Sequence, residues 1–224
     1  MGRQHMKCAE CDSKECQTGK DCTKLRDSIF DLYSGEALKS MRTSTAVEAR
    51  YYGEKNRLEE VVLYASSMGY ERLGIAFCLG LEAEARELQR VLKGHFEVHS
   101  VCCKVCGIDK RELGLELLHG WDAEAMCNPI GQAMVLNREK TDLNLTVGLC
   151  VGHDALFIKH SEAPVSPFIV KDRVLGHNPA AALYSRYYKN RRENMENMEE
   201  MGEMEEMERL EDIEARDDPT AGRE

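Results

Sequence analysis

The sequence predicts an α/β domain, a three-layer sandwich with a mostly parallel sheet, preceded by a small Cys-rich metal-binding knuckle. Two observations predict the sandwich: short apolar segments of strand length, and helical segments of about a dozen residues between them. Strands that are joined by such crossover helices pair in parallel. The expected strands are 72–79, 96–102, 143–150 and 166–170.

Apolar periodicity and terminal residues define the expected helices. Residues 45–68 carry apolar side chains mostly at helical intervals, and Gly69 is a plausible end. Asn128 and Asn178 are each followed by proline, which is typical of a helix N-terminus with asparagine at the cap and proline in the first turn. The expected helices are 45–68, 82–93, 128–137 and 180–189.

Charge divides the chain of 224 residues into segments. The net charge is −10, but residues 189–224 hold 14 acidic and 6 basic side chains, so most of the acidity belongs to this tail. Five tail methionines recur every third residue, a spacing that sweeps around a helix instead of forming one stripe. We therefore expect a knuckle in residues 1–25, a core domain in 26–188 and an acidic, Met/Glu-rich low-complexity tail in 189–224.

The chain contains no apolar run of 18 residues and no apolar segment near its start that resembles a secretory signal. These features predict no membrane partner and a cytoplasmic location. Ten cysteines in such a chain favour metal binding or thiol chemistry over a disulfide framework, because the cytoplasm is reducing.

The knuckle holds four cysteines within 15 residues, Cys8, Cys11, Cys16 and Cys22. Short turns between them would return the chain to one ion, and the segment is expected to fold only with that metal bound. Zinc is the default ion, and an iron–sulfur cluster is the alternative, because both accept four cysteine sulfurs.

The knuckle spacing is similar to that of the zinc knuckles that bind single-stranded nucleic acid, C-x2-C-x4-H-x4-C. It departs from that motif because Cys16 replaces the histidine and the last gap has five residues. Residues 8–22 contain no aromatic side chain on which a base could stack, and their acidic residues offset the lysines. Nucleic acid is therefore not an expected partner.

Further cysteines lie where predicted strands end or helices begin. Cys103 and Cys106 form a CxxC after the second strand, Cys127 precedes the Asn128–Pro129 helix start, and Cys150 ends the third strand. Parallel strands bring these ends to one edge of the sheet, where α/β proteins bind ligands. The spacing predicts that these four cysteines hold a shared cofactor. Cys78 has a similar position but lies in an apolar run, so it is the weakest candidate, and a core position is the alternative.

His153 follows Cys150 by three residues, within reach of the same ion. It is our candidate for a catalytic proton-transfer residue or ligand. An equally simple interpretation is that it caps the next helix or bonds to Asp154.

Several strings in the chain are specific enough to carry a resemblance: SVCCKVCGIDK, MCNPIGQAMVLN, TDLNLTVGLCVGHDALFIKHS and VKDRVLGHNPAAALY. From about Cys8 to Tyr184 the chain resembles an uncharacterised prokaryotic family, catalogued as a domain of unknown function and described as predicted metal-binding. The resemblance implies a metal site but no established reaction. Without Cys106, the core centre would have three thiolates.

Three functions compete on this evidence. The first is an iron–sulfur protein in which three thiolates leave one iron open to a sulfur-containing small-molecule substrate. The second is a non-catalytic protein that handles or senses zinc or another metal. The third is a thiol redox protein that uses Cys103 and Cys106. The sequence favours a metal-binding protein with a core centre that is iron–sulfur rather than zinc.

Overall fold

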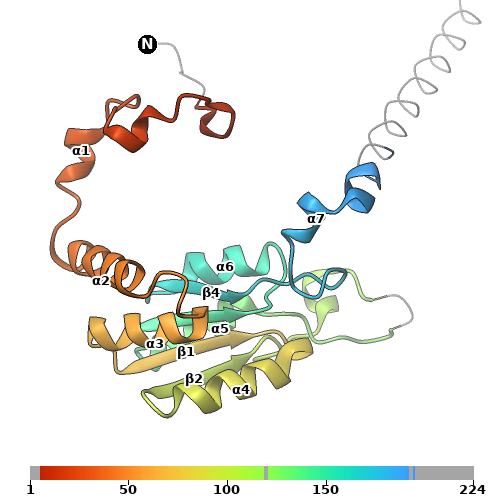
Figure 1. Ribbon diagram of the computed structural model, residues 1–224. Coiled ribbons are helices and arrows are strands. Elements are labelled where there is room, and N and C mark those ends of the chain that lie inside the picture. Colours follow the sequence, from red (N-terminus) through yellow and green to blue (C-terminus); the bar gives the residue numbers. More distant parts are fainter. Residues whose placement is uncertain (1–5, 119–120, 192–193, 195–224) are drawn as a thin grey trace, which may run out of the picture. The chain divides into compact units, whose positions relative to one another are not determined.

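The computed structural model describes residues 6–118, 121–191 and 194, and the chain divides into two compact units, Met1–Tyr70 and Glu71–Glu224 (Figure 1). The boundaries expected at residues 25 and 188 stay predictions. Most of the predicted Met/Glu-rich tail, including its five methionines, lies outside the described residues.

The regular elements in the described part of the first unit are all helices. It contains two 3-10 turns, η1 and η2, and three α-helices: η1 Cys8–Glu10, η2 Glu15–Thr18, α1 Arg26–Phe30, α2 Gly35–Tyr51 and α3 Arg57–Met68. The side chains of Ser40 in α2 and Tyr64 in α3 share a hydrogen bond of 2.8 Å, and Lys39 donates to the Met68 carbonyl.

The single helix predicted for 45–68 is wrong, because the structure has two helices there. Gly53 takes a φ of +72°, a conformation that favours glycine and ends α2. Asn56 then caps α3 with a reciprocal capping box, in which its side chain accepts from Glu59 N and the Glu59 carboxylate accepts from Asn56 N. The apolar periodicity continues across this break, which explains why it was not predicted.

The second unit alternates strands and helices. Its elements are β1 Arg72–Phe77, η3 Leu79–Leu81, α4 Glu82–Leu92, β2 Glu97–Cys102, η4 Lys110–Leu113, α5 Pro129–Arg138, β3 Leu143–Val147, α6 His153–His160, β4 Val165–Ile169 and α7 Ala181–Tyr184. The four strands agree with the predicted segments to within a few residues. The predicted helix over 180–189 is interrupted, because Ser185 is extended.

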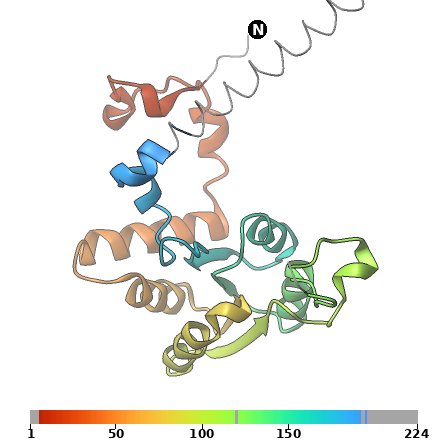
Figure 2. The same cartoon turned by 90° about the vertical axis from the view of Figure 1, so that its right-hand side faces the viewer.

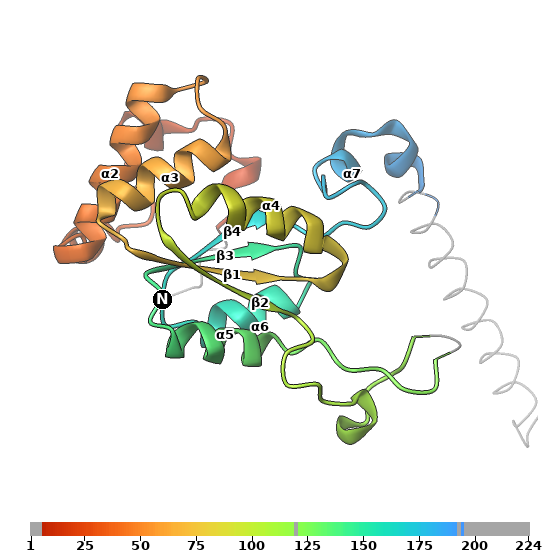
Figure 3. The same ribbon diagram turned by 90° about the horizontal axis from the view of Figure 1, so that it is seen from below.

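The sheet has the order β2-β1-β3-β4, and all neighbouring strands are parallel. Helix α4 covers one face, and α5 and α6 cover the other (Figure 3). The predicted three-layer α/β fold is thereby confirmed. β1 and β3 are central and buried along most of their length, as expected for strands covered on both faces.

The core under α5 and α6 is apolar. Its buried members are Ala76, Val101, Ala133, Leu136, Leu149 and Phe157. Burial of these side chains holds α5 and α6 against the carboxyl halves of the strands, next to the loops that carry the cysteines. Among the described helices, none is both long enough and apolar enough to cross a membrane.

Candidate functional site: a thiol pocket at the sheet edge

A cysteine or a lysine follows the carboxyl end of each of the four strands. Cys103 follows β2, Cys78 follows β1, Cys150 follows β3 by three residues, and Lys171 follows β4 by two. In the sheet, β2 lies on one side of β1 and β3 lies on the other side. The crevice between the ends of β1 and β3 is therefore a topological switch point, where open α/β sheets bind ligands.

A small pocket lies at this edge, and we call it the thiol pocket. Its volume is about 10 Å³, close to the space that one water molecule needs. It is lined by Cys78, Cys103, Cys127, Pro129, Gln132, Leu149, Cys150 and His153.

Cys103 is the central sulfur of this pocket. Its thiol accepts a hydrogen bond from Leu79 N at 3.4 Å, and the thiols of Cys78 and Cys127 line the same pocket. Backbone bonds fix these positions, since Cys103 N donates to the Phe77 carbonyl at 2.9 Å and Asn128 N donates to the Cys103 carbonyl at 2.7 Å. Three cysteines that lie 25 and 24 residues apart in the chain therefore meet at one point.

The pKa values of Cys78, Cys103 and Cys127 differ, because the three thiols affect one another. The Cys103 thiol, then Gly80 N and Lys171, lower the pKa of Cys78 to about 4. The Cys103 thiol also lowers the pKa of Cys127 to about 6, and the charges of Lys104 and His153 add to this effect. The pKa of Cys103 is raised, because it donates to Cys127 and Cys78 and because it is buried. Thiolates are the form of cysteine that binds metals and acts as a nucleophile.

Two cations from the loop after β4 approach the outer sulfurs. Lys171 Nζ lies 3.3 Å from Cys78 Sγ, and Arg173 Nη2 lies 3.1 Å from Cys150 Sγ. A Cβ added to Gly80 would lie 3.3 Å from Lys171 Nζ, so the absence of a side chain there makes room for the lysine.

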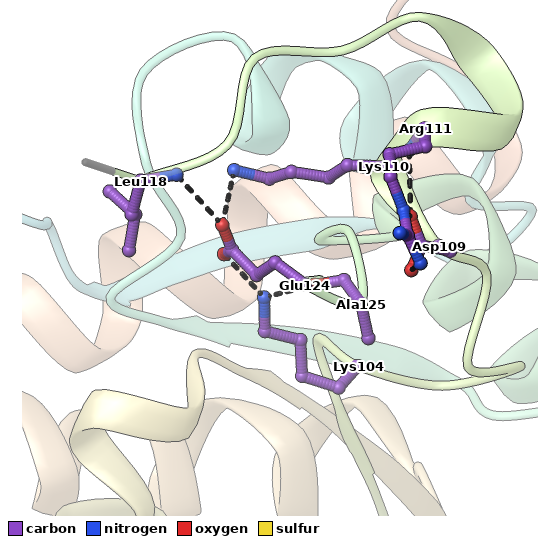
Figure 4. Close-up of polar contacts among 7 residues, drawn as sticks. All are labelled: Lys104, Asp109, Lys110, Arg111, Leu118, Glu124 and Ala125. Carbon is purple, nitrogen blue, oxygen red and sulfur yellow. Dashed lines mark hydrogen bonds and ion pairs between the residues drawn. The ribbon is translucent and has the colours of Figure 1, made fainter. Parts of the chain in front are cut away.

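The segment from Cys103 to Cys127 leaves the sheet and returns to it (Figure 2). Glu124 holds this excursion, because its carboxylate pairs with Lys104 Nζ at 3.3 Å and Lys110 Nζ at 2.8 Å and accepts from Leu118 N at 3.2 Å (Figure 4). A β-bridge joins Asp109 to Ala125 beside it. These contacts return the chain to the sheet edge and so place Cys127 opposite Cys103.

The structure brings together three of the four predicted core ligands, Cys103, Cys127 and Cys150, with Cys78 in addition. Cys106 instead lies exposed in a turn, with a φ of +70°, and does not line the pocket. Its role as a ligand stays a prediction. His153 lines the pocket as the first residue of α6, where its N–H donates to the Cys150 carbonyl at 2.9 Å.

Sequence reasoning missed Gln132 and Arg173 and undervalued Cys78. Gln132 lies in the first turn of α5, four residues after the Asn128 cap, and its side chain bridges β1 and β2 through two carbonyls. The only sequence signal for Cys78 was its place after a strand. No comparable signal marked Arg173, because its partner Cys150 is 23 residues away.

The four knuckle cysteines, Cys8, Cys11, Cys16 and Cys22, are exposed thiols. Gly19 makes the turn between the last two with a φ of +97°. Hydrogen bonds from the backbone near Lys14 and from the Ser13 side chain lower the pKa of Cys11. In the described part of the chain, no group of three or more Cys, His, Asp and Glu side chains is already arranged to hold a metal ion.

The comparisons place the chain in a family. The family model described as a protein of unknown function (DUF1847) matches residues 16–168. An uncharacterised protein of the archaeon Methanocaldococcus jannaschii is 54% identical over 185 residues, which cover 82% of this chain and 96% of the relative. The predicted kinship with an uncharacterised prokaryotic family is thereby confirmed. No solved structure matches the chain.

Proposed function

The chain belongs to the DUF1847 family of proteins of unknown function, and we propose that it is a metal-binding protein with a thiolate-ligated centre in the thiol pocket. The ligands would be drawn from Cys78, Cys103, Cys127 and Cys150, which all line that pocket. A second site would form when Cys8, Cys11, Cys16 and Cys22 close around an ion.

One observation carries the core site. Cys78, Cys103 and Cys127, which come from three separate places in the chain, line one small pocket at the switch point. An ion bound there would replace the thiol protons of these side chains. The donor set fits a thiophilic metal, because soft thiolates select zinc, copper(I) and iron–sulfur clusters.

The small size of the pocket favours one ion over a cluster. Four sulfurs that surround an ion at the zinc–sulfur bond length of about 2.3 Å nearly touch one another. An iron–sulfur cluster, the cofactor predicted first from the sequence, needs the sulfurs further apart, and the pocket of about 10 Å³ would have to widen for it. The metal and acid-labile sulfide content of the protein distinguishes zinc from an iron–sulfur cluster.

The residues around the centre support a reaction on a small molecule. A bound metal would supply Lewis acidity to a sulfur-containing ligand. His153 lines the pocket and is our candidate for proton transfer at its imidazole. The alternative is a protein that only handles or senses metal, which needs the same ligands but no proton transfer by His153. A His153→Asn variant that keeps its metal would show that His153 is not a ligand.

The thiol redox function based on Cys103 and Cys106 has less support. The cysteines that line the pocket with Cys103 include Cys78 and Cys127, whereas Cys106 is exposed in its turn. That pairing stays a prediction and is not our conclusion.

The test is the metal and acid-labile sulfide content of protein purified without air, in the wild type and in a Cys11→Ser variant that lacks a knuckle ligand. Two ions per wild-type chain, one in the variant and no sulfide would support a mononuclear core centre. Iron with matching sulfide and a brown colour in both proteins would support the cluster form. A Cys11→Ser protein without metal would contradict the core site.

A further inference from the structure

The neighbouring strands β1 and β2 are followed by cysteines at matching positions. The last pair in the register of the two strands is Phe77 with Cys102. The pairing continues for one more bond, because Cys103 N donates to the Phe77 carbonyl at 2.9 Å. Cys78 and Cys103 are therefore the next residues side by side on the two parallel segments.

Matching positions on neighbouring strands suit a disulfide bond. Neighbouring strands lie about 4.8 Å apart, and the Cα atoms of disulfide-bonded cysteines lie about 4.4–6.8 Å apart. The side chains of Cys78 and Cys103 line the same pocket, so they lie on the same side of the sheet. Leu79 N, the next backbone group after Cys78, donates to Cys103 Sγ at 3.4 Å. This pair of cysteines thus meets the backbone requirement for a disulfide.

The two cysteines differ in their access to solvent. Cys103 is buried, with 3% of its surface exposed, whereas Cys78 is partly exposed and precedes Leu79, which is 51% exposed. Lys171 Nζ lies 3.3 Å from Cys78 Sγ. A cation beside a cysteine favours the thiolate, which is its nucleophilic form. An oxidant that arrives from solvent would therefore react first at Cys78, with Cys103 as the second thiol.

We propose that Cys78 is a site of oxidation by hydrogen peroxide and that Cys103 converts the oxidised form into a disulfide. In the first step, the sulfur of Cys78 attacks one peroxide oxygen and the O–O bond breaks. The other oxygen leaves as water with the thiol proton, and Cys78 becomes a sulfenic acid.

In the second step, the sulfur of Cys103 attacks the sulfur of Cys78 and the S–O bond breaks. The hydroxyl group leaves as water with the proton of Cys103, and the S–S bond forms. The two thiols thereby supply the two electrons that reduce one hydrogen peroxide to two waters. The product joins the ends of β1 and β2.

The inference does not depend on the proposed metal centre, because the reaction needs only the two thiols and the peroxide. It has a consequence for that centre, since sulfurs that are joined in a disulfide are no longer thiolates. The oxidised protein would lack two of the candidate ligands, Cys78 and Cys103.

The test is a disulfide map of the full-length protein. Reduced protein is freed of metal with a chelator, treated with hydrogen peroxide, alkylated at its remaining thiols and cut with trypsin. Because trypsin cuts after lysine and arginine, Cys78 lies in peptide 73–86, Cys103 lies in peptide 94–104, and Cys106 falls in the next peptide. Mass spectrometry then identifies which peptides are joined.

We expect peptide 73–86 to be joined to peptide 94–104 in the wild type, and this link to be lost in Cys78→Ser and in Cys103→Ser. Cys102→Ser is the matched control, since Cys102 lies in the same peptide as Cys103 but does not line the pocket. This variant should keep the link. A link that is lost in Cys102→Ser and kept in Cys103→Ser would overturn the proposal.

The wild-type map decides the proposal even if a variant does not fold. A Cys103 peptide that is joined to the peptide of Cys106 or Cys127, and not to that of Cys78, would overturn it. A Cys78 that ends as a sulfinic acid with Cys103 still reduced would also overturn it, because a disulfide partner within reach would have reacted first. Dithiothreitol should restore both thiols of the expected product, as it does for a disulfide but not for a sulfinic acid.

Discussion

The backbone N–H of Asn128 donates to the carbonyl oxygen of Cys103 at 2.7 Å. This bond closes the excursion that begins after β2, and the residue before Asn128 is Cys127. The same asparagine caps α5 by accepting from Gly131 N at 2.8 Å. Asn128 thus both starts a helix and joins the backbone segments that carry Cys103 and Cys127, so backbone bonds help to form the thiol pocket.

The first prediction concerns Cys127. A Cys127→Ser variant should lose the core metal and keep the knuckle metal, because one of the contacting sulfurs becomes a much poorer ligand for a soft ion. Metal content per chain, measured after gel filtration, checks this result. Cys102→Ser is the control, since Cys102 is next to Cys103 but does not line the pocket. Full metal content in Cys127→Ser would show that Cys127 is not a ligand.

The second prediction decides between Cys78 and Cys106. Cys78 contacts Cys103 and lines the pocket, whereas Cys106 is exposed. We therefore expect Cys78→Ser to reduce affinity for the core metal strongly and Cys106→Ser to have little effect, as measured by competition with a chelator of known affinity. The opposite ranking would restore the CxxC as part of the centre.

The third prediction tests the packing that supports the pocket. A Cβ at Gly74 in β1 would overlap Asn144 Oδ1 and would lie 2.9 Å from Leu136 Cδ1, both of which are fully buried. Gly74→Ala should lower the free energy of unfolding by about 1–3 kcal/mol through overpacking. Denaturant unfolding measures this change, and an unchanged midpoint would mean that β1 and β3 are packed differently from the structure.

The fourth prediction uses the pH dependence of the excursion. Hydrogen bonds from Lys110, and then from Leu118 N and Lys104, lower the pKa of Glu124 from its ordinary value of 4.5. Because the folded carboxylate has the lower pKa, its contribution to stability is complete above pH 4.5 and is lost as the pH falls through the lowered value. Amide exchange of Leu118, corrected for the intrinsic rate, should therefore lose protection in acid.

Glu124→Gln provides the matched comparison for this pH effect. The amide has no charge for Lys104 and Lys110, so protection of Leu118 should be lower at neutral pH and should not change through the acidic range. A variant with the same acid-dependent loss as the wild type would assign the titration to another group.

The sequence predicted most of this fold and part of this site, and the difference has physical causes. Strands and helices follow from local periodicity and from caps such as Asn128–Pro129, which act within a few residues. The break between α2 and α3 was missed because the apolar spacing continues across Gly53. The start of α3 is marked only by the capping box at Asn56, and apolar periodicity does not detect that signal.

For the site, spacing along the chain identified strand-end cysteines but could not rank them. Cys106 was favoured because a CxxC is compact in sequence, but a left-handed turn directs the chain away from the pocket at that residue. Cys78 was undervalued because an apolar run resembles a core. Gln132 bonds to residues in β1 and β2, and Arg173 bonds to Cys150 in the loop after β3. Such contacts depend on the strand order, which local patterns do not determine.

X-ray absorption at the metal edge of the Cys11→Ser protein tests the central claim most directly, because it counts the atoms bound to the remaining metal. The account predicts a shell of three or four sulfurs, at about 2.3 Å for zinc, and the loss of this signal in a Cys11→Ser, Cys103→Ser double variant. A metal bound only by nitrogen and oxygen, or a sulfur shell that survives the loss of Cys103, would contradict a thiolate centre at the sheet edge.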